Sequence, residues 1–247
     1  MPLTFCRAAL GTGFTFLMTT LGAAMVFVLP GEQHPRLQKL MLGFAAGVMT
    51  AASVWSLLIP AMEQTEAEQV FPVWIPPTLG ILSGAVFLIV LDAVIICRVS
   101  IRRQNTLLMT AITLHNIPEG MAVGLACALS VRNGSAAGAA ALALGIGIQN
   151  FPEGAAVSLP MCRERGGRVR AFLCGTLSGA VEPLFGLLTV GAASLAQFLM
   201  PWLLSFAAGA MLYVVAEELT PQAQSRAGTC GYLFGFLLMM VLDVALG

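Results

Sequence analysis

Two copies of one short pattern, each rich in groups that bind cations, lie in the most apolar part of the sequence. HNIPEG begins at His115, and QNFPEG begins at Gln149, 34 residues later. On a helix, His115 and Glu119 are about one turn apart and share a face, and Gln149 and Glu153 repeat this spacing. Each copy therefore places a carboxylate beside an imidazole or an amide.

The other residues of the pattern extend each ligand set. Asn116 and Asn150 lie about 100° round the helix, at the edge of the same face. Pro118 and Pro152 have no N–H group, so each bends its helix and leaves the carbonyl four residues earlier without its usual donor. The glycine that ends each copy allows a neighbouring helix to approach closely. If the two faces meet, carboxylates, amides, an imidazole and free carbonyls converge.

These side chains favour a divalent cation. An uncompensated charge in the centre of a bilayer costs about 2.5–3.5 kcal/mol on insertion scales, and no lysine or arginine lies at comparable depth. Oxygen and nitrogen ligands suit zinc, iron or manganese better than copper(I), and two ions bridged by Glu119 and Glu153 would use them all. Glu182, also just before a proline, is the best third acid. Met49 offers a thioether, although with thirteen methionines packing is its default role. The alternative is a pair of kinked helices that pack through hydrogen-bonded polar residues.

The elements that must position these residues are membrane helices. The chain is 58% hydrophobic and only 10% charged, whereas a soluble domain carries about 25% charged residues. The six scattered cysteines are read as small apolar residues, and the zero net charge gives no sign of nucleic-acid binding. The apolar runs predict one all-α transmembrane domain over residues 1–247, with eight spans of about 20 residues or more each. They cover residues 7–29, 39–61, 75–97, 107–130, 136–161, 169–191, 198–219 and 229–247.

Basic residues orient the predicted spans. Ten lysines and arginines fall in one set of alternating loops, whereas only Arg7 and Arg132 fall on the other side. Because basic residues are retained in the cytoplasm, both termini are predicted to lie outside. The segment after the second span holds Glu63, Glu66 and Glu68 and would gather cations outside. For Glu66 and Glu68 an ordinary solvated loop is the alternative.

An inverted repeat is predicted from matching segments in the two halves. FAAGVM (residues 44–49) opens the core of the second span, FAAGAM (206–211) does so in the seventh, and VLD recurs at Asp92 and Asp243. Four spans lie between the two copies of each match, so the copies run in opposite directions, which favours a binding site near the midplane. The two aspartates would mark opposite ends of a pore, or else be interfacial acids at helix ends. Ser56 in the second span has a register similar to that of Glu217 and Glu218 in the seventh. These residues are predicted to contact the ion along its path rather than to be its main ligands.

On these residues the chain resembles the ZIP (Zrt-, Irt-like protein) family of divalent metal transporters. HNxPEG followed by xNxPEG in eight spans carries the resemblance, and QNFPEGAAVSLP is most similar to the GufA-like branch. The resemblance implies a 3+2+3 helix arrangement and a binuclear metal site. One ion would be held by His115, Glu119, Gln149 and Glu153, and the second by Asn116, Asn150 and Glu182 with the two shared glutamates. Met49 matches a position that contacts the first ion, and Ser56, Glu63, Glu217 and Glu218 match route positions.

The resemblance implies a secondary transporter that moves Zn²⁺, or Cd²⁺, Fe²⁺ or Mn²⁺, into the cytoplasm. Spans 1, 4, 5 and 6 would move in an elevator-type motion against spans 2, 3, 7 and 8, which would pair two subunits in a bacterial plasma membrane. Asn150 is an aspartate in some relatives, and an amide weakens the second position; Glu217 replaces a histidine of some relatives. Neither a nucleotide nor a nucleic acid is expected as a partner. The alternative is an intramembrane metal-dependent enzyme, although no H-E-x-x-H sequence is present.

Overall fold

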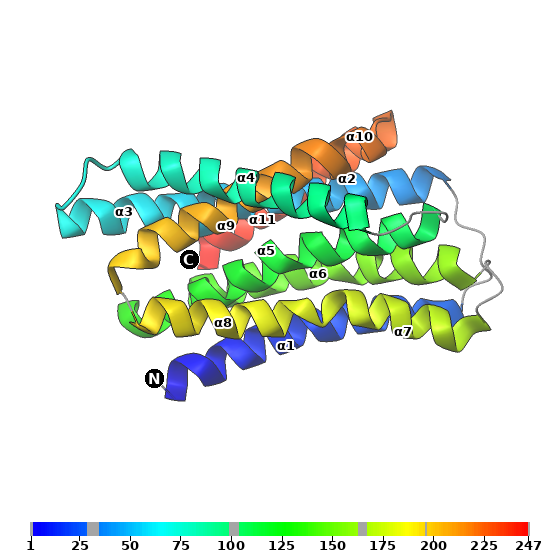
Figure 1. The fold of residues 1–247 in the computed structure, drawn as a ribbon, viewed down its shortest axis with the longest axis horizontal. Helices are drawn as coiled ribbons and strands as arrows, with labels where there is room; N and C mark the ends of the chain where they lie inside the picture. The colour runs from blue at the N-terminus through cyan, green and yellow to red at the C-terminus, as the bar shows by residue number, and fades with distance from the viewer. Residues whose placement is uncertain (1, 29–34, 99–103, 163–166, 196, 247) are drawn as a thin grey trace.

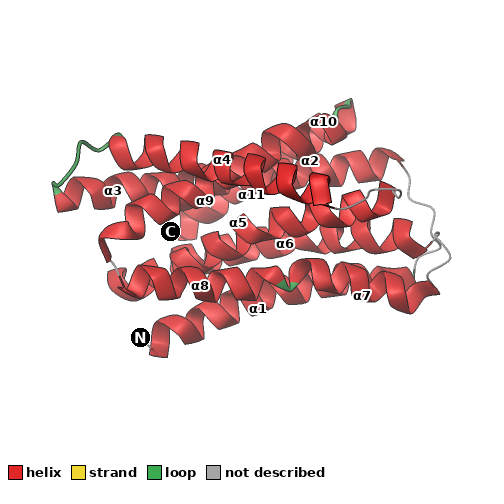
Figure 2. Cartoon of the chain, viewed as in Figure 1, coloured by secondary structure: helices red, strands yellow, loops and turns green. Residues whose placement is uncertain are grey.

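The computed structural model describes residues 2–28, 35–98, 104–162, 167–195 and 197–246. In these ranges the chain is helical apart from short turns (Figure 2). Four of the ten basic residues predicted to face the cytoplasm lie outside the described residues. They are Arg102, Arg103, Arg163 and Arg165. The backbone of His115 is described, but its side chain is not.

Eleven α-helices, several joined by short turns of other helical types, make up the described chain. They are α1 (Pro2–Ala24), α2 (Pro35–Ala52), α3 (Ile59–Glu68), α4 (Ile75–Arg98), α5 (Gln104–Asn133), α6 (Ala137–Met161), α7 (Gly167–Gly179), α8 (Val181–Leu195), α9 (Met200–Val214), α10 (Thr220–Ala223) and α11 (Arg226–Leu246). Two 3₁₀ turns, η1 (Met25–Phe27) and η4 (Gln197–Leu199), follow α1 and precede α9. Two π-helical turns, η2 (Ser53–Leu58) and η5 (Val215–Leu219), continue α2 into α3 and α9 into α10.

The protein is an all-α, multi-pass membrane protein. Six helical segments of the described chain are long and apolar enough to cross a bilayer. They cover Pro2–Phe27, Pro35–Glu68, Ile75–Val94, Gly167–Ala193, Met200–Ala223 and Arg226–Ala245. The remaining long helices, α5 and α6, carry the two motifs and bury most of their described side chains.

The helices form two groups, each held by its own close pairs. In the first group, α1 packs along α6 and α5 packs along α8. In the second group, α2 packs along α11 and α4 packs along α9. Figure 1 shows the second group above and the first below, with α5 and α6 next to the boundary. Both motifs therefore belong to the first group.

Glycines bring the backbones of the second group into contact. A methyl group at Gly47 of α2 would stand 2.1 Å from the carbonyl oxygen of Tyr232 in α11. A methyl group at Gly209 of α9 would stand 2.2 Å from the carbonyl oxygen of Ile81 in α4. Membrane helices gain little from apolar burial against one another, so close backbone packing of this kind is what holds such pairs together.

The acidic segment after the second span is helical, which corrects the prediction of a loop. Glu63, Glu66 and Glu68 lie on α3, which ends where Gln69 takes a left-handed conformation with φ 53°. The segment AMEQTEAE consists mainly of strong helix formers, so the helix continues beyond the apolar run. The acids therefore project from a fixed helix.

A break between α7 and α8 directs Glu182. Pro183 cannot donate to the carbonyl of Gly179, and the chain makes a tighter turn in which the Ala180 N–H donates to Leu177 O at 3.2 Å. Glu182 lies in the first turn of α8, directly after the break. The predicted sixth span is thus two helices that meet beside a buried acid.

Candidate metal site

The two motifs lie on helices that continue through their prolines, and their polar side chains are buried. Pro118 lies inside α5, and α6 runs unbroken past Pro152. The exposed fraction is 0% for Asn116, Glu119, Gln149, Asn150 and Glu182, and 4% for Glu153. Burying this many polar groups in a membrane protein requires partners for them.

Six buried oxygen atoms of the motifs lack a hydrogen-bond partner among the described residues. They are Asn116 Oδ1, Glu119 Oε2, Gln149 Oε1, Asn150 Oδ1, Glu153 Oε1 and Glu153 Oε2. An unsatisfied buried polar group costs about 1–3 kcal/mol, and more when it is charged. Each of these atoms is an acceptor that a cation would satisfy. The donor set, carboxylate and amide oxygens, fits a divalent ion such as zinc or manganese.

The two asparagines are oriented by backbone carbonyls of neighbouring helices. Asn116 Nδ2 donates to Ser178 O at 2.8 Å, and Asn150 Nδ2 donates to Thr15 O at 3.5 Å. Because each amide nitrogen is engaged in this way, each amide oxygen is left free as a ligand. Sequence reasoning missed Thr15 and Ser178, because a backbone acceptor leaves no trace in the residue types.

The three acids of the candidate site, Glu119, Glu153 and Glu182, differ in how they are held. Gln149 Nε2 donates to Glu119 Oε1. Glu182 accepts at both oxygens, from Thr19 Oγ1 at 3.1 Å and from Asn150 Nδ2 at 2.9 Å. Glu153 has no hydrogen-bond partner at either oxygen among the described residues. Protein donors therefore hold Glu119 at one oxygen and Glu182 at both, whereas none among the described residues holds Glu153.

Two predicted ligands, His115 and Met49, are not among the buried polar side chains described above. The side chain of His115 lies outside the described part of the chain. Met49 is fully buried in the main hydrophobic core, together with Ile117 and Met121. Among the described side chains, no group of three or more histidines, cysteines, aspartates and glutamates is arranged to hold a metal ion.

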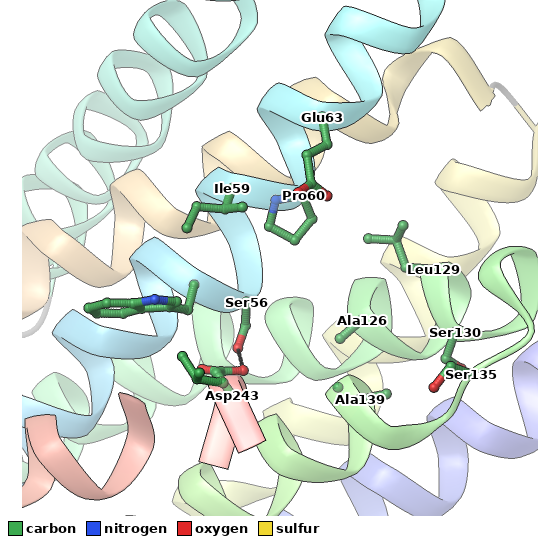
Figure 3. Close-up of a pocket in the computed structure, with 13 residues that line it drawn as sticks. Ser56, Ile59, Pro60, Glu63, Ala126, Leu129, Ser130, Ser135, Ala139 and Asp243 are labelled. Atoms are coloured by element: carbon green, nitrogen blue, oxygen red, sulfur yellow. Dashed lines mark hydrogen bonds between the residues drawn. The ribbon is translucent and has the colours of Figure 1, made fainter. Parts of the chain in front are cut away.

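A cavity of about 330 Å³, called here the Ser56 cavity, lies between the two groups of helices. Its walls come from η2, α3 and α11 on one side and from α5 and α6 on the other. Figure 3 shows Ser56 pointing toward Asp243, to which it donates a 2.6 Å hydrogen bond. Glu63 also lines the cavity, and Asp243 Oδ2 has no partner among the described residues. Ser56, Glu63 and Asp243, three residues predicted to lie on the ion route, thus line one cavity. Ser130 and Ser135 also line it and were not predicted from the sequence.

The other predicted route residues lie on different elements. Asp92 is on α4, and Glu217 and Glu218 are on η5. The side chain of Glu217 is exposed and that of Glu218 is half-buried. None of the three lines the Ser56 cavity as described.

The fold and the buried acceptors define a multi-pass membrane protein with an internal, oxygen-rich set of cation ligands. Residues 94–243 match the family described as ZIP Zinc transporter. The chain is 37% identical to the zinc transporter ZIP11 of Xenopus tropicalis, over 98% of this chain and 97% of that one. It is also 35% identical to the zinc transporter GufA of Myxococcus xanthus, over 93% and 94%. For the zinc transporter ZIPB of Bordetella bronchiseptica the identity is 36%, over 97% and 81%. The chain belongs to the ZIP family and is similar to its GufA-like members.

Proposed function

We propose that this protein transports zinc across the membrane into the cytoplasm and binds it between α5, α6 and α8. The six unpartnered acceptor oxygens of the paired motifs carry this proposal, because a cation is what would satisfy all of them. The relatives reported above are named zinc transporters, which supports zinc as the substrate.

The ligand set supports two adjacent ion positions. His115, Glu119, Gln149 and Glu153 would hold the first ion, with Met49 as a further contact. Asn116, Asn150 and Glu182 would hold the second, and the two motif glutamates would bridge both ions. The free oxygens of both asparagines and both glutamates support this division.

Eight spans related by an inverted repeat would frame the site. The repeat aligns Gly47 with Gly209, and the match of Asp92 with Asp243 aligns Ile81 with Tyr232. The close contact of Gly47 with Tyr232 is therefore equivalent to that of Gly209 with Ile81. The π-helical turns η2 and η5 also begin at aligned positions.

The same relation extends into the site. A methyl group at Gly120 would stand 2.3 Å from Glu182 O, and one at Gly154 would stand 2.0 Å from Thr19 O. Since Gly120 and Gly154 end the two motifs, Glu182 and Thr19 are equivalent positions of α8 and α1. The hydrogen bonds of the two asparagines are equivalent in the same way. Asn116 donates to the carbonyl four residues before Glu182, and Asn150 donates to the carbonyl four residues before Thr19. A pseudo-two-fold axis between α5 and α6 accounts for all of these pairs.

The arrangement supports an elevator-type motion of the first group of helices against the second. The first group carries nearly every ligand, whereas the second forms one wall of the Ser56 cavity and supplies Asp92, Glu217 and Glu218. In Figure 1 the start of α1, the end of α11 and the acidic helix α3 lie toward one end, and α10 lies at the other. This supports termini and acids on one side, which we propose is the outer side. We also propose that the second group pairs two subunits in a bacterial plasma membrane.

Zinc flux separates a transporter from an intramembrane enzyme. Purified protein in liposomes should accumulate radioactive zinc, and unlabelled Cd²⁺, Fe²⁺ or Mn²⁺ added outside should reveal the selectivity by competition. Hydrolysis of ester and peptide substrates is measured on the same vesicles. Turnover of these substrates without zinc uptake above protein-free liposomes would reject the transport proposal.

A further inference from the structure

The carboxylate of Glu182 is held at both oxygens by side chains of two other helices. Thr19 of α1 donates to Oε1 at 3.1 Å, and Asn150 of α6 donates to Oε2 at 2.9 Å. All three residues have an exposed fraction of 0%. Glu182 is thus fixed in direction by protein donors, whereas Glu153 is not.

Packing fixes the hydroxyl of Thr19. A methyl group at Gly154 would stand 2.0 Å from Thr19 O, and one at Gly179 would stand 2.9 Å from Thr19 Cβ and Cγ2. Thr19 therefore lies tightly between α6 and α7, and its branched side chain has few rotamers in a helix. The other acceptor for its hydroxyl, Thr15 O, is farther away at 3.3 Å.

We propose that Thr19 is a positioning residue that aims the Glu182 carboxylate at the second ion. This inference rests on the proposed function and deepens it. In the repeat, Thr19 of α1 is equivalent to Glu182 of α8. The C-terminal half of the chain therefore supplies the acid, and the N-terminal half supplies the hydroxyl that orients it. Partners that orient a metal ligand commonly change metal affinity by about 10–100-fold when they are removed.

Thr19→Val removes the hydroxyl and keeps the shape of the side chain. In equilibrium dialysis of the full-length protein in detergent, the wild type should bind two zinc ions per chain. The variant should bind the first ion as before and the second about tenfold more weakly. Thr19→Ser should restore the second ion to within about threefold, because its hydroxyl reaches the same oxygen.

Thr12→Val is the matched control. Thr12 is equally buried on α1, but its hydroxyl donates only to Ala8 O of its own helix, at 2.7 Å. This variant should bind both ions like the wild type. If Thr19→Val does not fold, Thr19→Ala removes the same hydroxyl with a smaller side chain and should give the same loss.

The outcomes separate the two claims. A wild type that binds two ions, together with a folded Thr19→Val that binds both equally well, overturns the role of Thr19 and leaves the proposed function intact. A wild type that binds one ion while transporting zinc also overturns it, because no second ion exists to be positioned. A wild type that neither binds nor transports zinc removes the proposed function itself.

Discussion

At the scale of single residues, the candidate site is marked by six buried acceptor oxygens that have no donor among the described residues. Glu153 is the extreme case, since neither of its carboxylate oxygens has a hydrogen-bond partner among the described residues. Gln149 differs, because its nitrogen donates to Glu119 and its oxygen stays free. Gln149 thus presents an amide oxygen where the first motif has the histidine of HNIPEG.

Gln149→His should tighten zinc binding. An imidazole nitrogen is a better zinc ligand than an amide oxygen, and the two motifs would become nearly equivalent. We expect the apparent KM for zinc to fall about tenfold, with an equal or lower maximal rate because the ion must also leave. The ratio of zinc to manganese uptake, measured in matched vesicles at one pH, should rise. An unchanged KM and an unchanged ratio would show that residue 149 does not contact the ion.

The acids and amides of the candidate site could be picked out from the sequence because their types and spacing are costly inside a bilayer, and the structure buries them. It did not predict how they are oriented. Thr19 and Glu182 are 163 residues apart, and a threonine in a membrane helix is ordinary, so nothing local marks their hydrogen bond. The carbonyls of Thr15 and Ser178 carry no signal in residue type at all.

At the scale of the elements, close backbone packing determines which helices pair. Apolar runs predicted the positions of the helices to within a few residues, apart from α3, which continues to Glu68. The π-helical turns η2 and η5 were not predicted, because a π turn accommodates one extra residue without a distinctive composition. The break before α8 had a local cause in Pro183, but proline alone does not predict it, since α5 and α6 continue past theirs.

Gly47→Ala should destabilise the protein, because the new methyl group would stand 2.1 Å from Tyr232 O and force α2 away from α11. A clash of this kind costs about 1–3 kcal/mol. We expect a lower Tm for the purified protein in detergent. Gly13→Ala is the control, since a methyl group there meets nothing within 4 Å. An equal Tm for both variants would show that this helix pair tolerates separation.

At the scale of the whole molecule, the two groups of helices meet where α6 packs against α2 and α11 and where α5 packs against α9. A methyl group at Gly145 of α6 would stand 2.2 Å from the sulfur of Met239 in α11. Residues 145 and 239 therefore face each other across the boundary between the two groups. An elevator motion would require the two groups to slide past each other there. Joining them should stop transport without altering the metal ligands.

Gly145→Cys combined with Met239→Cys, in a chain whose native cysteines are replaced, provides this test. A short thiol-specific cross-linker should reduce zinc uptake at least tenfold, and reduction of a cleavable linker should restore it. Each single cysteine treated with the same reagent is the control. Full uptake by cross-linked protein would contradict relative motion at this boundary.

Zinc uptake by Glu153→Gln tests the central claim most directly. The substitution keeps the shape of the side chain and removes the carboxylate whose two oxygens have no partner among the described residues, so the protein should fold. Radioactive zinc uptake into liposomes is compared at equal protein content with the wild type and with Glu66→Gln, which changes an exposed acid of α3. We expect wild-type uptake for Glu66→Gln and no uptake above that of protein-free liposomes for Glu153→Gln. Uptake by Glu153→Gln within about twofold of the wild type would contradict the claim that the paired motifs hold the transported ion.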